Sequence, residues 1–183
     1  CPTVSITQIS NQAREALEFI WRNAKSLGVN RDQITVMGHS AGGHITQMMM
    51  GTKWAEFSAG LPADLVTAGI PISPLSYLEP VRLTEALNAG IGMTAAEADS
   101  QSPMVAHPPS TNASQLVAVG GNETEEFHRQ AQMYVDTFSS DDRSMEIYVV
   151  PDADHFDELN VLADLNSPFF SKTLDIVRST NRF

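Results

Sequence analysis

Residues 35–44, which read TVMGHSAGGH, constrain the fold of this chain more than any other stretch. A short β-branched run leads into Gly-x-Ser-x-Gly, and the apolar residues 45–50 that follow predict a helix. A strand, a sharp turn bearing a serine and a helix are the context of a nucleophile elbow, which exposes the serine hydroxyl above a sheet edge. Ser40 is therefore a candidate nucleophile, with the Ala41 N–H at the helix start as a candidate oxyanion donor. The alternative is a glycine-rich turn without chemistry.

The rest of the chain alternates between helical and strand patterns. Apolar residues at steps of three and four predict a helix over residues 9–26 that ends near Gly28. Short apolar runs predict strands over residues 33–37, 65–72, 115–119 and 145–150. Further helices are expected over residues 127–138 and 168–178, with short helical pieces around 81–87 and 95–99. This order predicts an α/β fold with a parallel sheet covered by helices on both faces.

Composition limits the class of protein. With 183 residues, 42% of them hydrophobic and 18% charged, the chain suits a single domain over residues 1–183, in which residues 73–114 form a Pro-, Ser- and Ala-rich excursion. The net charge of −11, without a local Lys/Arg cluster, disfavours nucleic acid as a partner. No apolar run reaches the roughly 18 residues of a membrane span. We expect a cytoplasmic protein, while two glycosylation-type triplets, at residues 112–114 and 122–124, leave secretion open.

A serine nucleophile needs a base and an orienting acid, in the chain order Ser, acid, His. Of the five histidines, His155 follows the last predicted strand, where a loop at the carboxyl edge of the sheet can return its imidazole to Ser40. The other four are interpreted as packing, surface or capping residues: His39, His44, His107 and His128.

The acid is expected in the loop after the preceding strand, which reads GGNETEE. Asn122 and Glu125 have the spacing of a capping box, which gives Glu125 a structural explanation. Glu123 has no such explanation and is the candidate acid for His155. A first-turn glutamate favoured by the helix dipole is the competing interpretation of Glu123.

Several motifs together resemble the kynurenine formamidase (arylformamidase) branch of the α/β-hydrolases and its close esterase relatives. They are Cys1-Pro2, GHSAGGH at residues 38–44, LEP at 78–80, Ser102-Pro103 and EFHRQ at 126–130. The resemblance implies a serine hydrolase of an aryl formamide, similar to N-formylkynurenine, or of a small carboxylic ester. It places the acid at Glu123, where the family usually has aspartate, and the base at His155. No metal or organic cofactor is implied.

The chain departs from this family at its start. Members open with further strands and a His-Gly-Gly loop that supplies a second oxyanion donor, and nothing in this sequence matches either. A first strand without a partner would expose unpaired backbone groups. We therefore expect an N-terminal segment of the same protein, missing or present as a separate chain, to cover that strand, and we expect these residues alone to be unstable or nearly inactive. Self-association is left open.

Two other functional classes remain to be compared with a serine hydrolase. A chain that begins with Cys1 is compatible with an N-terminal-nucleophile hydrolase, which predicts a sandwich of sheets around the N-terminus. A hydrolase-like binding module without catalysis is the other alternative. If the protein is an enzyme, a small molecule is its substrate, and we expect His39, Leu75 and Tyr77 to contact it.

Overall fold

Four strands form one parallel sheet in the computed structural model, which describes Cys1 and residues 3–179. They are β1 (Thr35–His39), β2 (Ala68–Ile72), β3 (Ser114–Gly120) and β4 (Met145–Val150), and they lie side by side in the order of the sequence. All four carboxyl ends therefore meet at one edge of the sheet. The expected α/β fold is confirmed, and a sandwich of sheets around Cys1 is not what the structure has.

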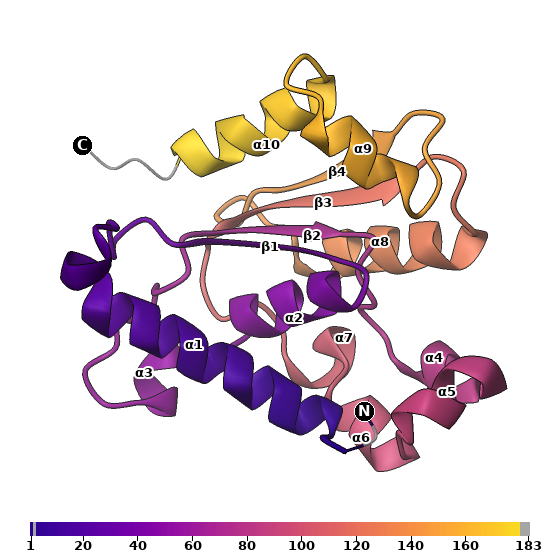
Figure 1. Cartoon of the computed structure of the whole chain (residues 1–183), viewed down its shortest axis with the longest axis horizontal. Helices are drawn as coiled ribbons and strands as arrows, with labels where there is room; N and C mark the ends of the chain where they lie inside the picture. Colours follow the sequence, from indigo (N-terminus) through magenta and orange to yellow (C-terminus); the bar gives the residue numbers. More distant parts are fainter. Residues whose placement is uncertain (2, 180–183) are drawn as a thin grey trace.

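Helices cover both faces of this sheet (Figure 1). On one face, α2 (Ala41–Met50) packs on β1 and β2, α8 (Glu125–Phe138) packs on β3 and β4, and α1 (Ile6–Leu27) lies against α2. On the other face lie α9 (Asp157–Ala163) and α10 (Pro168–Ser179). Buried apolar side chains fill both interfaces: Met48, Met49 and Trp54 on the first, and Ile70, Leu116 and Phe169 on the second.

The first helix begins and ends at recognisable caps. Ser5 and Gln8 form a capping box, so α1 starts three residues before the predicted residue 9. Gly28 ends the helix in the left-handed conformation, with φ of 69°. The predicted end was correct, and the capping box was the available signal for the start.

One predicted strand was displaced along the chain and another was predicted to start too early. The first covers Thr35–His39 and not residues 33–37, so that it runs directly into Ser40. The second begins at Ala68 and not at residue 65. Leu65 and Val66 are buried in the core, but they precede the paired backbone. Apolar residues report burial, and burial extends beyond the paired backbone.

The excursion between β2 and β3 consists of four short helices (Figure 1). They are α4 (Glu79–Leu83), α5 (Glu85–Ile91), α6 (Ala95–Ser100) and α7 (Pro103–Ala106). The helical piece expected around residues 81–87 is divided at Thr84, which caps α5. Leu78, Val81, Met93 and Ala98 give the excursion a small core of its own. A further short helix, α3 (Trp54–Phe57), follows α2.

Strand β1 lies at one end of the sheet and, within the described residues, pairs with β2 alone. Met37 on this strand is 53% exposed. An apolar groove of about 460 Å³ runs beside it between α1 and α2. The outer edge of β1 is therefore unpaired within the described residues. Every helix in the described part of the chain is too short or too polar to cross a membrane.

Candidate active site

Ser40 lies in the turn between β1 and α2, with φ of 57° and ψ of −115°. Its N–H donates to the carbonyl of Ile72 on β2, at 2.8 Å. Two glycines permit the tight turn, because a Cβ on Gly38 would lie 2.3 Å from the Gly42 oxygen and a Cβ on Gly43 would lie 2.7 Å from the Ile72 oxygen. Close approach of backbones therefore requires glycine at both positions.

The structure brings Ser40, His155 and Glu123 into one hydrogen-bonded chain. His155 Nε2 lies 3.0 Å from Ser40 Oγ, and His155 Nδ1 lies 2.5 Å from Glu123 Oε1. The His155 side chain is 25% exposed, whereas that of Glu123 is only 1% exposed. A carboxylate only accepts, so Nδ1 carries the ring proton and Nε2 is free to accept from the serine hydroxyl.

Glu123 is held by three groups at the carboxyl edge of the sheet. Its Oε1 faces His155, while its Oε2 accepts from the Ser73 hydroxyl and from the Gly120 N–H, the latter at 2.8 Å. Ser73 directly follows β2 and is fully buried. Sequence reasoning missed Ser73, although its place after a strand was the same signal that identified the loops of Glu123 and His155.

The capping box expected from Asn122 and Glu125 is wrong. Helix α8 begins at Glu125 with Thr124 as its N-cap, and no side chain caps it. Asn122 lies in the turn that follows β3, and its N–H donates instead to the carbonyl of Ala153, 2.9 Å away. Glu125 is exposed on the first turn of α8 and is not part of the hydrogen-bonded chain.

Three of the remaining histidines are not part of the hydrogen-bonded chain of Ser40, His155 and Glu123. His44 is buried on α2 with Nε2 2.7 Å from the Gln101 carbonyl oxygen, and burial lowers its pKa to about 4. His107 lies 2.9 Å from the carbonyl oxygen of Ser100, and burial lowers its pKa. His128 is half-buried on α8. These positions fit the interpretation as packing and surface residues.

His39 has a more specific environment than the sequence indicated. Its ring lies 4.4 Å from that of His155, and its Nε2 lies 3.0 Å from Oε1 of Glu158, in the first turn of α9. The Glu158 side chain is fully buried, and burial raises its pKa to about 7. Burial also lowers the pKa of His39. Sequence reasoning missed Glu158 because residues 157–163 were not recognised as a helix.

A metal ion finds no free set of ligands here. His39, His155 and Glu158 offer ligand atoms within 4.8 Å of one another. Both ring nitrogens of His155, however, are engaged by Ser40 and Glu123. Zinc sites in proteins use three or four ligands that are available to the ion. We therefore assign no metal site to these three residues.

An apolar pocket of about 230 Å³ lies beside this cluster. Phe127 connects the two, since its ring lies 4.9 Å from the His155 ring and also lines the pocket. Leu75 is part of the pocket wall, whereas Tyr77 lines none of the described pockets. The remaining wall comes from α4, α5 and the start of α8: Pro80, Val81, Thr84, Leu87, Thr124, Glu126 and Gln130.

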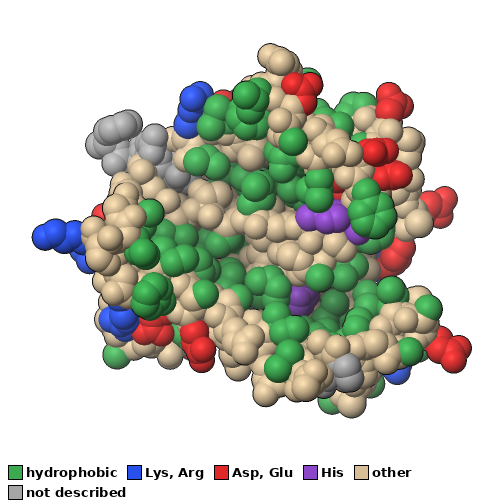
Figure 2. Space-filling view, viewed as in Figure 1, with side chains coloured by type: hydrophobic (Ala, Val, Ile, Leu, Met, Phe, Trp, Pro, Cys, Tyr) green, Lys and Arg blue, Asp and Glu red, His purple; other side chains and the backbone are tan. Residues whose placement is uncertain are grey.

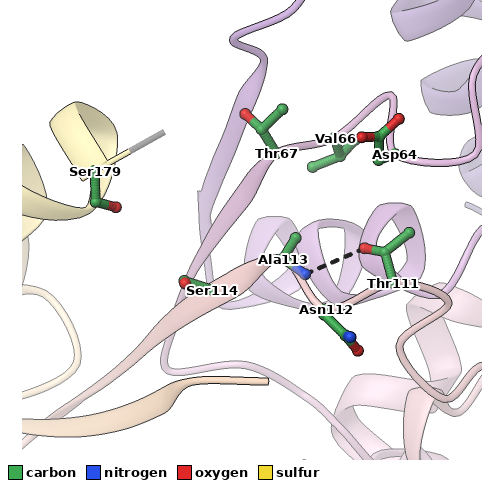
Figure 3. Close-up of a pocket in the computed structure, with 8 residues that line it drawn as sticks. All are labelled: Asp64, Val66, Thr67, Thr111, Asn112, Ala113, Ser114 and Ser179. Carbon is green, nitrogen blue, oxygen red and sulfur yellow. Dashed lines mark hydrogen bonds between the residues drawn. The ribbon is translucent and has the colours of Figure 1, made fainter. Parts of the chain in front are cut away.

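Figure 2 shows histidine side chains at the surface beside hydrophobic patches, on the side where the strands end in Figure 1. Another pocket, of about 330 Å³, lies at the opposite, amino edge of the sheet (Figure 3). Asn112 and Ser114 line it, together with Asp64 and Ser179. It holds no pairing of a nucleophile with a base, so the carboxyl edge of the sheet is the candidate active site.

Comparisons with known proteins show what the chain is similar to. Residues 4–61 match the family model described as BD-FAE. The kynurenine formamidase of Salmo salar is 30% identical over 132 residues, which are 69% of this chain. That of Danio rerio is 28% identical over 137 residues, or 70% of the chain. The chain spans 44% of the length of each relative.

Solved structures share the fold over most of the chain. A protein from Silicibacter sp. TM1040 proposed to be a thioesterase is 29% identical, with a TM-score of 0.72 over 93% of this chain and 59% of its own. An arylesterase has a TM-score of 0.65 at 19% identity, over 98% of this chain and 59% of its own. From its sheet and these similarities, the chain belongs to the α/β-hydrolase superfamily and is similar to kynurenine formamidases and related esterases.

Proposed function

We propose that the protein is a serine hydrolase that cleaves an aryl formamide or a small carboxylic ester through an acyl-enzyme on Ser40. The hydrogen-bonded chain from Ser40 through His155 to Glu123 is the observation that carries this proposal. His155 accepts the hydroxyl proton as Ser40 attacks the carbonyl carbon, and returns it to the leaving amine or alcohol. Glu123 holds the imidazole in the required tautomer and stabilises the imidazolium.

The acyl-enzyme is then hydrolysed by the reverse use of the same groups. Water loses a proton to His155 and attacks the acyl carbon, and Ser40 leaves with that proton. The N–H of Ala41 is in the first turn of α2, where backbone donors lack partners within the helix, and it faces the developing oxyanion. The apolar pocket beside Phe127 favours an aromatic or short aliphatic group on the substrate.

A second oxyanion donor is part of the proposal. Acyl-transfer sites generally use two or more donors, and loss of one costs about 10²–10³ in kcat. We propose that a segment outside these 183 residues supplies it, by pairing with the free edge of β1. The activity and substrate of the whole protein are proposed on the same basis, because the chain spans less than half of its curated relatives.

A fluorophosphonate probe tests the proposed function directly. We expect it to label Ser40 in the intact protein, as seen by mass spectrometry of the peptide that contains it, and to stop turnover of N-formyl-aniline derivatives and p-nitrophenyl acetate together. Iodoacetamide, which alkylates the exposed Cys1, should leave turnover unchanged. Loss of activity with Cys1 alkylation would instead support an N-terminal nucleophile, and no turnover or labelling at all would support a binding module.

Glu123 and its neighbour Glu125 provide a matched pair for the acid. Glu123→Gln should lower kcat by as much as about 10⁴-fold, because the amide cannot accept from His155, Ser73 and Gly120 at once. Glu125→Gln should leave kcat within about two-fold, since this side chain is exposed. Steady-state kinetics on one ester measures both. A larger loss of kcat in Glu125→Gln than in Glu123→Gln would show that Glu123 is not the acid.

A further inference from the structure

Glu158 is a buried carboxyl group next to the candidate active site that the proposed mechanism does not use. Its side chain has no exposed surface, and α9 brings it to the strand ends from the face of the sheet opposite α2. Neither of its oxygens makes a hydrogen bond of normal geometry within the described residues, and the same holds for Nε2 of His39, which lies 3.0 Å away. Burying a charged carboxylate without such bonds is costly, so this arrangement needs an explanation.

A single proton shared between Glu158 and His39 supplies the missing hydrogen bond between them. With the proton, the pair is neutral overall, and without it the carboxylate of Glu158 carries one negative charge. Burial raises the pKa of Glu158 to about 7, and the charges of Glu123 and Asp154 act in the same direction. The pair is therefore protonated below about pH 7 and negatively charged above it.

The groups that face Glu158 come from the carboxyl ends of all four strands. Its environment contains two histidines, two further carboxylates and two donors: His39 at the end of β1, Ser73 after β2, Gly120 at the end of β3 and Glu123 after it, and Asp154 and His155 after β4. The Ser73 hydroxyl and the Gly120 N–H both donate to Oε2 of Glu123, so neither of them satisfies an oxygen of Glu158. Loss of the proton thus adds a second negative charge to a cluster that already contains Glu123.

We propose that Glu158 and His39 form a second carboxylate–imidazole pair that tunes His155, so that the ionised pair favours the imidazolium formed when Ser40 attacks. The contact is direct, because the rings of His39 and His155 lie 4.4 Å apart. Glu158 and His39 are positioning residues, since they act through His155 and touch no reacting atom. The inference rests on the proposed function, because it requires His155 to be the base.

The expected signature is a rise in the pH profile that depends on Glu158. Between about pH 5 and about pH 9, the rate at which a fluorophosphonate labels Ser40 should include a rise of about ten-fold as Glu158 loses its proton near pH 7. Glu158→Gln keeps the shape of the side chain but cannot ionise. It should lose this rise and be labelled about ten-fold more slowly than the wild type at about pH 8.

Two further variants separate this role from a structural one. Asp157→Asn removes the same charge from the adjacent, exposed position and should retain the wild-type profile. His39→Phe keeps an aromatic ring against His155 but leaves Glu158 without its partner, so the rise that depends on Glu158 should move to higher pH. It also serves if Glu158→Gln fails to fold. A Glu158→Gln profile identical to the wild type overturns the inference alone, whereas a wild-type protein in which Ser40 is never labelled overturns the proposed function and the inference together.

Discussion

Ser40→Ala should abolish hydrolysis of both formamides and esters, with kcat reduced by at least about 10⁴-fold. The substitution removes one oxygen, and with it the atom that would attack the carbonyl and the partner of His155 Nε2. The backbone of the turn should be unaffected, because it is held by the bond from the Ser40 N–H to Ile72 and by the close packing of Gly38 and Gly43. Burst and steady-state release of p-nitrophenol from p-nitrophenyl acetate measures the loss.

Ser100→Ala is the matched control for this experiment. Ser100 ends α6, is exposed and bonds only to the carbonyl of Glu97 through its hydroxyl, so its removal should leave kcat unchanged. Thermal unfolding of both variants should stay close to the wild type. A Ser40→Ala protein that retains wild-type turnover would rule out the elbow serine as nucleophile.

His155→Ala should have an effect of similar size, about 10⁴-fold or more in kcat, since both proton transfers of the proposed mechanism pass through Nε2. Its loss also leaves Glu123 without its imidazole partner. Because the side chain is 25% exposed, removing it opens a space near the surface, and added imidazole should restore part of the rate. The rescue is measured as the increase of kcat with imidazole concentration.

His128→Ala provides the control for the base. His128 is half-buried on α8 and makes no contact with Ser40 or Glu123 in the described structure, so its replacement should leave kcat within about two-fold. If His155→Ala hydrolyses esters as fast as the wild type, another group must be the base, and His39 is then the next candidate by position.

The order of strands and the chemistry of their ends were predictable from the sequence. The turn of Ser40 follows β1, the loop of Glu123 follows β3 and the loop of His155 follows β4, and parallel strands necessarily bring these loops to one edge. The hydrogen bonds that join the three side chains were expected for this reason. Strand limits were less accurate, as at Leu65, where a buried residue precedes the paired backbone.

Ser73 and Glu158 were missed for two different reasons. Ser73 follows a predicted strand, but it is one of many serines, and its burial and its bond to Glu123 are visible only in the structure. Glu158 is acidic in a segment with three other acids nearby, Asp152, Asp154 and Asp157, and nothing local indicates which of them turns inward. The capping box predicted from Asn122 and Glu125 failed for another reason. The spacing of the two residues was right, but the turn after β3 places Asn122 outside the cap position.

The positive φ of Ser40 lowers the stability of the fold, while the proposed reaction requires a serine at this position. A residue with a side chain in such a backbone conformation costs about 1–3 kcal/mol, which glycine would largely avoid. Selection for a more stable protein alone would therefore favour glycine at position 40, whereas selection for turnover requires the one side chain that carries the hydroxyl. The hydrogen bond to β2 must offset this cost, and Gly38 and Gly43 allow the close packing around it, so the turn of Ser40 depends on an intact sheet.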